Sequence, residues 1–118
     1  MIVLVCGSRD WAEPEFLWRV LDAHHRAKPI TLLIEGEAPG ADTMARQWAE
    51  DRGVPFAPYP ANWDKFGKAA GPIRNAEMLA SGKPQLVIAF AHDLDKSRGT
   101  RDMVTKARAA GVHIKHYP

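Results

Sequence analysis

The sequence predicts an α/β fold in which a parallel sheet lies between two layers of helices. Short apolar runs of strand length alternate along the chain with longer segments whose apolar residues recur at helical spacing. The apolar runs do not alternate with polar residues, so we expect strands that are buried on both faces. Strands that alternate with helices join through right-handed crossovers, which gives a three-layer α/β/α sandwich.

Five strands are predicted, and the third is the weakest. It is short and interrupted by proline, which suits the edge of a sheet. We expect the order 3-2-1-4-5, which is Rossmann-like, with ligands binding in the crevice between the first and fourth strands. The predicted strands span residues 2–5, 30–34, 54–58, 85–90 and 112–116.

Four helices are predicted in the crossovers, over residues 14–28, 41–52, 72–80 and 100–110. Pro14 and Pro72 suit a first helical turn, and Gly53 and Gly111 suit the residue that closes a helix. The segment between the third strand and the third helix, Tyr59 to Gly71, is irregular. Segments of this kind often carry function.

Length and charge restrict the possible classes of protein. The 118 residues suit one domain over residues 1–118. The net charge of +2 comes from 16 basic and 14 acidic residues without a concentrated basic run, so polymeric nucleic acid is not an expected partner. Cys6 has no partner for a disulfide, and the apolar N-terminal run is too short for a signal peptide or a membrane span. We therefore expect a cytoplasmic protein.

Distinctive residues follow the first four strands, and the carboxyl ends of parallel strands meet at one edge of the sheet. Glycines in these loops let backbone N–H groups approach an anion, while hydroxyls and guanidinium groups suit phosphate. Trp63 and Phe66 could offer a face to a base, although such residues are more often core fillers. The expected ligand-binding residues are Gly7, Ser8, Arg9, Gly36, Glu37, Gly40, Asp42, Trp63, Gly71, Arg74, Asn75, Gly99 and Thr100.

Each of these patterns also has a purely structural reading. Asp42 could only stabilise the start of its helix. His24 and His25 have no spaced ligand partners and are predicted to lie on a helix surface, so neither a metal nor a cofactor is required. The chain also lacks the G-x-G-x-x-G and G-x-x-x-x-G-K-[ST] fingerprints of dinucleotide dehydrogenases and P-loop NTPases.

Taken together, the loops resemble a known family. They are Gly7-Ser8-Arg9, residues 35–42 (EGEAPGAD), Ala61-Asn62-Trp63, residues 67–78 (GKAAGPIRNAEM) and Gly99-Thr100. The set resembles the YspA- and cpYpsA-related branch of the SLOG superfamily, which includes Lonely Guy phosphoribohydrolases and DprA. The resemblance implies a Rossmann-like fold that binds nucleotides or molecules derived from NAD and ADP-ribose.

The resemblance to Lonely Guy enzymes is incomplete. Their P-G-G-x-G-T-x-x-E loop carries a glutamate needed for N-glycosidic cleavage, and an arginine at a helix start assists. Arg74 matches that arginine, whereas Met103 stands where the glutamate should be. A methionine cannot act as a carboxylate does in such a reaction. Glu37, Asp42 or Glu77 could replace it only by projecting into the pocket.

We therefore expect a module that binds a phosphate-bearing nucleotide or nucleotide derivative, as a sensor or a sequestering protein. The alternative is a hydrolase of nucleoside 5′-monophosphates or ADP-ribose-like molecules, a nucleotide N-glycosidase, in which Glu37 or Glu77 is the acid/base and Arg9 and Arg74 bind phosphate. A second alternative is DprA-like binding of single-stranded nucleic acid through basic residues near the C-terminus: Arg98, Arg101, Lys106 and Arg108. Four tryptophans also suggest a homo-oligomer.

Overall fold

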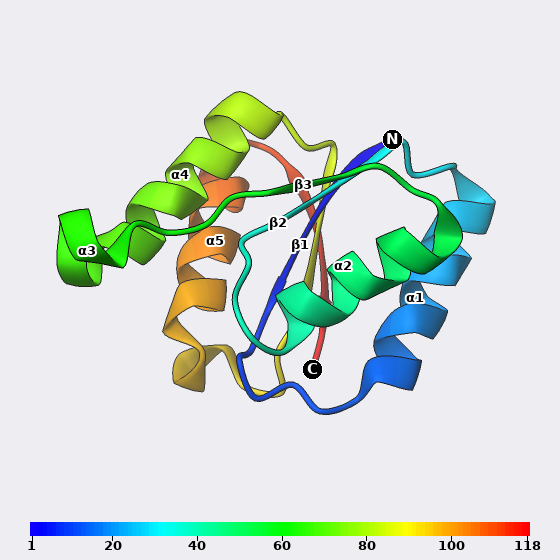
Figure 1. Cartoon of the computed structure of the whole chain (residues 1–118), viewed down its shortest axis with the longest axis horizontal. Helices are drawn as coiled ribbons and strands as arrows, with labels where there is room; N and C mark the ends of the chain where they lie inside the picture. The colour runs from blue at the N-terminus through cyan, green and yellow to red at the C-terminus, as the bar shows by residue number, and fades with distance from the viewer.

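A computed structural model describes residues 1–118 and contains one five-stranded parallel sheet. The strand order is β3-β2-β1-β4-β5, which confirms the predicted Rossmann-like order (Figure 1). The strands are β1 (Ile2–Gly7), β2 (Leu32–Glu35), β3 (Phe56–Pro58), β4 (Leu86–Phe90) and β5 (His113–Tyr117). The α-helices are α1 (Pro14–Ala27), α2 (Ala41–Arg52), α3 (Trp63–Phe66), α4 (Ala70–Gly82) and α5 (Arg98–Ala109), and two short 3-10 helices are η1 (Gly67–Ala69) and η2 (Leu94–Lys96).

The helices form two layers, one on each face of the sheet. In Figure 1, α1 and α2 lie on one side of the strands, and α4 and α5 lie on the other. Each side has its own apolar core. Trp48 and Phe90 belong to the core shared with α1 and α2, whereas Leu4, Met78 and Met103 belong to the core shared with α4 and α5. The central strands are therefore buried on both faces, as their unbroken apolar runs predict.

The structure differs from the sequence prediction mainly at element ends. The segment Tyr59 to Gly71 is not wholly irregular, because it contains α3 and η1, and Asn62 caps α3 by accepting a hydrogen bond from the Lys65 N–H at 3.1 Å. Helix α4 begins at Ala70 and α5 at Arg98, each two residues earlier than predicted. Strand β2 begins two residues late, because the Ile30 N–H donates to the His25 ring at 2.9 Å instead of to a strand.

Several local predictions can be compared directly with the structure. Gly53 closes α2 in the left-handed region at φ 68°, as predicted. Cys6 is a free, buried cysteine. The prediction that His24 and His25 are surface residues is wrong, because both are half-buried and hydrogen-bonded, His24 to the Tyr117 hydroxyl at 3.1 Å. No helix combines the length and the apolar character that a membrane span requires.

Candidate functional site

A cavity of about 900 Å³ opens at the carboxyl edge of the sheet. It is bounded by the end of β1, the first turns of α2, α4 and α5, and the residues of η2. Gly7 pairs with Phe90 in the sheet, and the Ser8 N–H donates to the Phe90 carbonyl at 2.8 Å. The end of β1 that borders the cavity is therefore held against β4, which is where the strand order predicts a ligand crevice.

Most of the expected ligand-binding residues line this cavity. They are Gly7, Ser8, Arg9, Asp42, Trp63, Gly71, Arg74, Asn75, Gly99 and Thr100. Gly36 and Glu37 line a second cavity of about 230 Å³, which also contacts Arg9, Trp63 and Arg74. Gly40 and Glu77 line neither cavity, and Glu77 is exposed on α4.

Gly40 supports the site through its backbone. Its φ of +80° and ψ of −124° lie outside the conformations that residues with a Cβ adopt. A Cβ at this position would lie 2.4 Å from the carbonyl oxygen of Ser8 and 2.6 Å from that of Arg9. Gly40 therefore lets the loop before α2 pack against the loop after β1.

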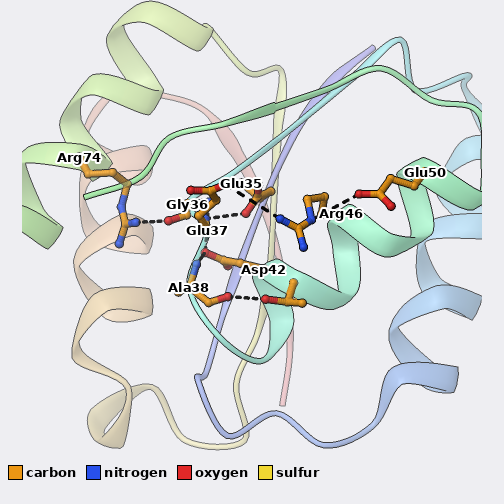
Figure 2. Close-up of polar contacts among 9 residues, drawn as sticks. Glu35, Gly36, Glu37, Ala38, Asp42, Arg46, Glu50 and Arg74 are labelled. Atoms are coloured by element: carbon orange, nitrogen blue, oxygen red, sulfur yellow. Dashed lines mark hydrogen bonds and ion pairs between the residues drawn. The ribbon is translucent and has the colours of Figure 1, made fainter. Parts of the chain in front are cut away.

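Asp42 organises the loop between β2 and α2. One carboxylate oxygen accepts hydrogen bonds from the Gly36 N–H at 3.1 Å and the Ala38 N–H at 3.2 Å (Figure 2). Burial raises the pKa of Asp42 to about 6, although the Ala38 N–H and the positive charge of Arg74 oppose this shift. Asp42 also lines the larger cavity, so it holds the loop and borders the site at once.

Glu35 is a buried acid that sequence reasoning placed in a loop without a role. It ends β2 with no exposed surface, and burial raises its pKa to about 7. One of its oxygens accepts from the Glu37 N–H, and the other has no hydrogen-bond partner. Glu37 itself adopts a φ of 56°, which is uncommon for a residue with a side chain. Glu35 thus fixes a left-handed turn at Glu37.

Arg74 joins three parts of the site without a carboxylate partner. Its guanidinium donates to the Gly36 carbonyl and, at 3.0 Å, to Asn75 Oδ1. Asn75, which is 4% exposed, donates in turn to the Gly99 carbonyl at 3.1 Å and to Asp102 at 3.0 Å. The β2–α2 loop, α4 and the start of α5 are therefore connected through neutral acceptors around a permanent positive charge.

The larger cavity is lined by five cationic side chains and four acidic ones, the acids being Asp10, Asp42, Asp95 and Asp102. Two of its carboxylates have cationic partners: Asp102 pairs with Lys106, and Asp95 lies 3.6 Å from Arg101. By contrast, five cations of the lining form no ion pair: Arg9, Lys68, Arg74, Lys96 and Arg98.

The start of α5 adds partial positive charge at the same place, whereas α4 continues from η1, whose Gly67 carbonyl accepts from the Ala70 N–H. Neither α4 nor α5 has a side-chain cap or an acidic residue in its first turn. Gly99 lies in that turn of α5, and the space where a Cβ would stand is open to 4 Å. Backbone N–H groups there are accessible to an anion.

Trp63 stands at the boundary between the two cavities. It lines both of them and is 47% exposed, so it is not a core residue. The Arg9 guanidinium carbon lies 5.7 Å from the centre of its ring, and a Cβ on Gly71 would lie 3.3 Å from the ring edge. Phe66 is also exposed, at 40%, but it lines neither cavity.

Met103 and its neighbour Asp102 show what α5 carries in place of the glutamate of the Lonely Guy loop. The side chain of Met103 is fully buried in the core beneath the helix, so it cannot face the cavity. The neighbouring Asp102 does line the cavity, and sequence reasoning did not select it. The sequence signal for Asp102 was its spacing of four residues from Lys106, which favours an ion pair on one face of a helix. No group of three or more His, Cys, Asp or Glu side chains is placed to hold a metal ion.

Comparison with known proteins assigns the chain to a family. Residues 1–66 match the YspA, cpYpsA-related SLOG family. The chain is also 34% identical over 121 residues to the Gene 61 protein of Mycobacterium phage D29, covering 98% of this chain and 94% of that protein. The chain belongs to the YspA, cpYpsA-related SLOG family.

The fold of this SLOG protein is similar to that of a larger solved structure. It aligns with the X-ray structure of DNA processing protein A (DprA) from Streptococcus pneumoniae at a TM-score of 0.78 and 20% identity. The alignment covers 98% of this chain and 50% of the DprA chain, so the SLOG protein spans about half the length of that relative. At this identity the likeness concerns the fold alone.

Proposed function

We propose that this SLOG protein binds a phosphate-bearing nucleotide or nucleotide derivative in the larger cavity, as a sensor or sequestering module. The observation that carries the proposal is the set of five cations in the lining that have no carboxylate partner. A half-buried guanidinium such as Arg74 needs a counter-charge, and a bound phosphate supplies one.

The phosphate is proposed to lie near the first turn of α5. Gly99 leaves the backbone open there, the Thr100 hydroxyl lies close by, and Arg98 is exposed. The volume of about 900 Å³ falls in the range of about 300–1,000 Å³ that ligand pockets occupy. There is therefore room for a sugar and a base beside the phosphate.

A thermal-shift screen tests the proposal. AMP, ADP, ATP, NAD, ADP-ribose and cyclic nucleotides are each added to the protein, with adenosine as the matched ligand that lacks phosphate. We expect at least one phosphate-bearing compound to raise the melting temperature, because binding to the folded state alone stabilises it, and we expect adenosine to have little effect. If no nucleotide changes the melting temperature, the proposal is wrong.

An N-glycosidase is the alternative, and one observation favours it. Asp42 borders the cavity with a pKa raised to about 6, which suits an acid/base near neutral pH. Glu77 lies outside both cavities and is a poor candidate. Free base released from a stabilising nucleotide, and no longer released by Asp42→Asn, would support an enzyme. Recovery of the intact nucleotide would support the sensor or sequestering role.

Binding of single-stranded nucleic acid is the second alternative, suggested by the name of the DprA relative. Two of the four basic residues first considered for this role already have acidic partners, Arg101 with Asp95 and Lys106 with Asp102. Arg98 and Arg108 remain exposed. A labelled oligonucleotide retained at low salt and released steeply as salt rises would support this function. If the oligonucleotide is not retained at low salt, binding of single-stranded nucleic acid is excluded.

A further inference from the structure

The smaller cavity has the properties of a pocket for one heterocyclic ring. Its volume of about 230 Å³ is below the range of about 300–1,000 Å³ of whole-ligand pockets. It shares Arg9, Trp63 and Arg74 with the larger cavity, so one ligand can extend from one into the other. Its other lining residues are Gly36, Glu37, Pro39, Pro60 and Ala61, together with Ala38, which also lines the larger cavity.

Trp63 offers an exposed indole to the smaller cavity. Gly71 lets the indole approach α4 closely, and the Arg9 guanidinium lies over it, so the side chain is held from two directions. It nevertheless remains 47% exposed. A base that stacks on the indole would bury apolar surface that the chain itself leaves open.

Glu37 is the acidic side chain of this smaller cavity, and its carboxylate has no hydrogen-bond donor within the chain. Its only ionic partner is Arg46, at 4.0 Å, and Arg46 also lies 3.5 Å from Glu50 (Figure 2). The buried carboxyl of Glu35 holds the Glu37 N–H and so fixes the left-handed backbone at this residue. Glu35 therefore holds the backbone of Glu37 in an uncommon conformation. The carboxylate of Glu37 can accept hydrogen bonds but, when ionised, cannot donate them.

We infer that the smaller cavity selects a base carrying an exocyclic amine, with Glu37 accepting from the amine and Trp63 stacking on the ring. This inference rests on the proposed binding of nucleotides. A carboxylate accepts hydrogen bonds from amino groups of bases, and a base that lacks the amine leaves the carboxylate without that partner.

Matched nucleotide pairs test the inference by titration calorimetry. AMP is compared with purine ribonucleoside 5′-monophosphate, and GMP with IMP; each pair differs only by an amino group replaced by hydrogen. We expect the amino member of at least one pair to bind about tenfold more tightly, the size of effect that a hydrogen bond to a charged group produces. Glu37→Ala should abolish the preference, so that the two members of each pair bind equally.

Two controls separate recognition from structural effects. Glu50→Ala removes the other carboxylate beside Arg46, outside both cavities, and should keep the preference. Trp63 is the most exposed tryptophan of the chain, so a bound base should quench the fluorescence, and Trp63→Phe should remove the quenching. Equal binding within both pairs, or a preference that survives Glu37→Ala, would overturn the inference alone. Absence of binding by every nucleotide would overturn the proposed function as well.

Discussion

Arg74 and Gly40 show two ways in which single residues build the site. Arg74 supplies a positive charge that forms no ion pair, although it lowers the pKa of the buried Asp42, and it is held by the Gly36 carbonyl and Asn75. Gly40 supplies no chemistry to the cavity but lets two loops pack together. The sequence predicted Arg74 as a phosphate-binding guanidinium and Gly40 as a loop glycine that lets backbone N–H groups approach an anion. The contacts agree with a charged role for Arg74, whereas Gly40 acts through loop packing.

Gly40→Ala should destabilise the protein by about 1–3 kcal/mol, because the backbone conformation excludes a Cβ and the Ser8 carbonyl oxygen would lie 2.4 Å away. Urea denaturation measures this change. Gly99→Ala is the matched control, since its Cβ meets nothing within 4 Å and alanine favours a helix. Equal stability of wild type and Gly40→Ala would show that the loop adopts another conformation.

Glu35 predicts how stability depends on pH. Burial raises its pKa to about 7 from an ordinary value of 4.5, so the folded state binds the proton more tightly than the unfolded chain. The free energy of unfolding should therefore fall as pH rises from about 4.5 to about 7 and then level off. Asp42, with its pKa raised to about 6, adds a fall in the same direction.

Glu35→Gln should flatten this pH profile, leaving only the part that Asp42 contributes, because the amide cannot ionise. Denaturation curves between pH 4.5 and 8 make the measurement. Glu77→Gln serves as the control, since Glu77 is exposed and should leave the profile unchanged. If the pH profile of Glu35→Gln matches that of the wild type, burial does not raise the pKa of Glu35 in the folded protein.

At the scale of elements, the start of α5 is fixed by α4. Asn75 on α4 donates to the Gly99 carbonyl and to Asp102 on α5, and it accepts from Arg74. The first turn of α5 therefore keeps its position relative to the guanidinium that faces the same cavity. The phosphate recognition that we propose for this turn therefore depends on a contact between two helices.

Asn75→Ala should cost about 1–3 kcal/mol of stability, because it removes the three hydrogen bonds of a buried amide, with Arg74, the Gly99 carbonyl and Asp102. It should also weaken nucleotide binding, since both the guanidinium and the helix start lose their restraint. Thermal unfolding and titration calorimetry measure the two effects. Exposed Glu77 on the same helix provides the control, and an Asn75→Ala variant with unchanged affinity would contradict the positioning role.

The elements also show what local sequence can and cannot predict. Continuous apolar runs and helix-closing glycines predicted the number, type and order of the main elements, because these signals act within a few residues. The short helix α3 was missed because its four residues bury no side chain, and its cap at Asn62 is a weak signal. The role of Asn75 depends on contacts 24 and 27 residues away, which spacing does not show.

At the scale of the whole molecule, the parallel sheet brings the loops after several strands to one edge. This topology explains why residues from Cys6 to Asp102 line one cavity, and it allowed ten of the 21 lining residues to be predicted. The burial of Glu35 and the exposure of Trp63 could not be predicted, because both depend on how the β2–α2 loop and α3 pack. Trp11 and Trp48 are buried within the chain, so they offer no surface for contact with a second copy. The homo-oligomer stays a prediction.

Titration calorimetry with the most stabilising phosphate-bearing nucleotide tests the central claim most directly. Arg98 is exposed and forms no ion pair, so Arg98→Ser should leave the fold intact and weaken binding severalfold. Arg19→Ser removes an equally exposed arginine of α1, outside the cavity, and should leave the affinity unchanged. If Arg98→Ser binds as tightly as the wild type, or if both variants weaken binding equally, the larger cavity is not the phosphate site.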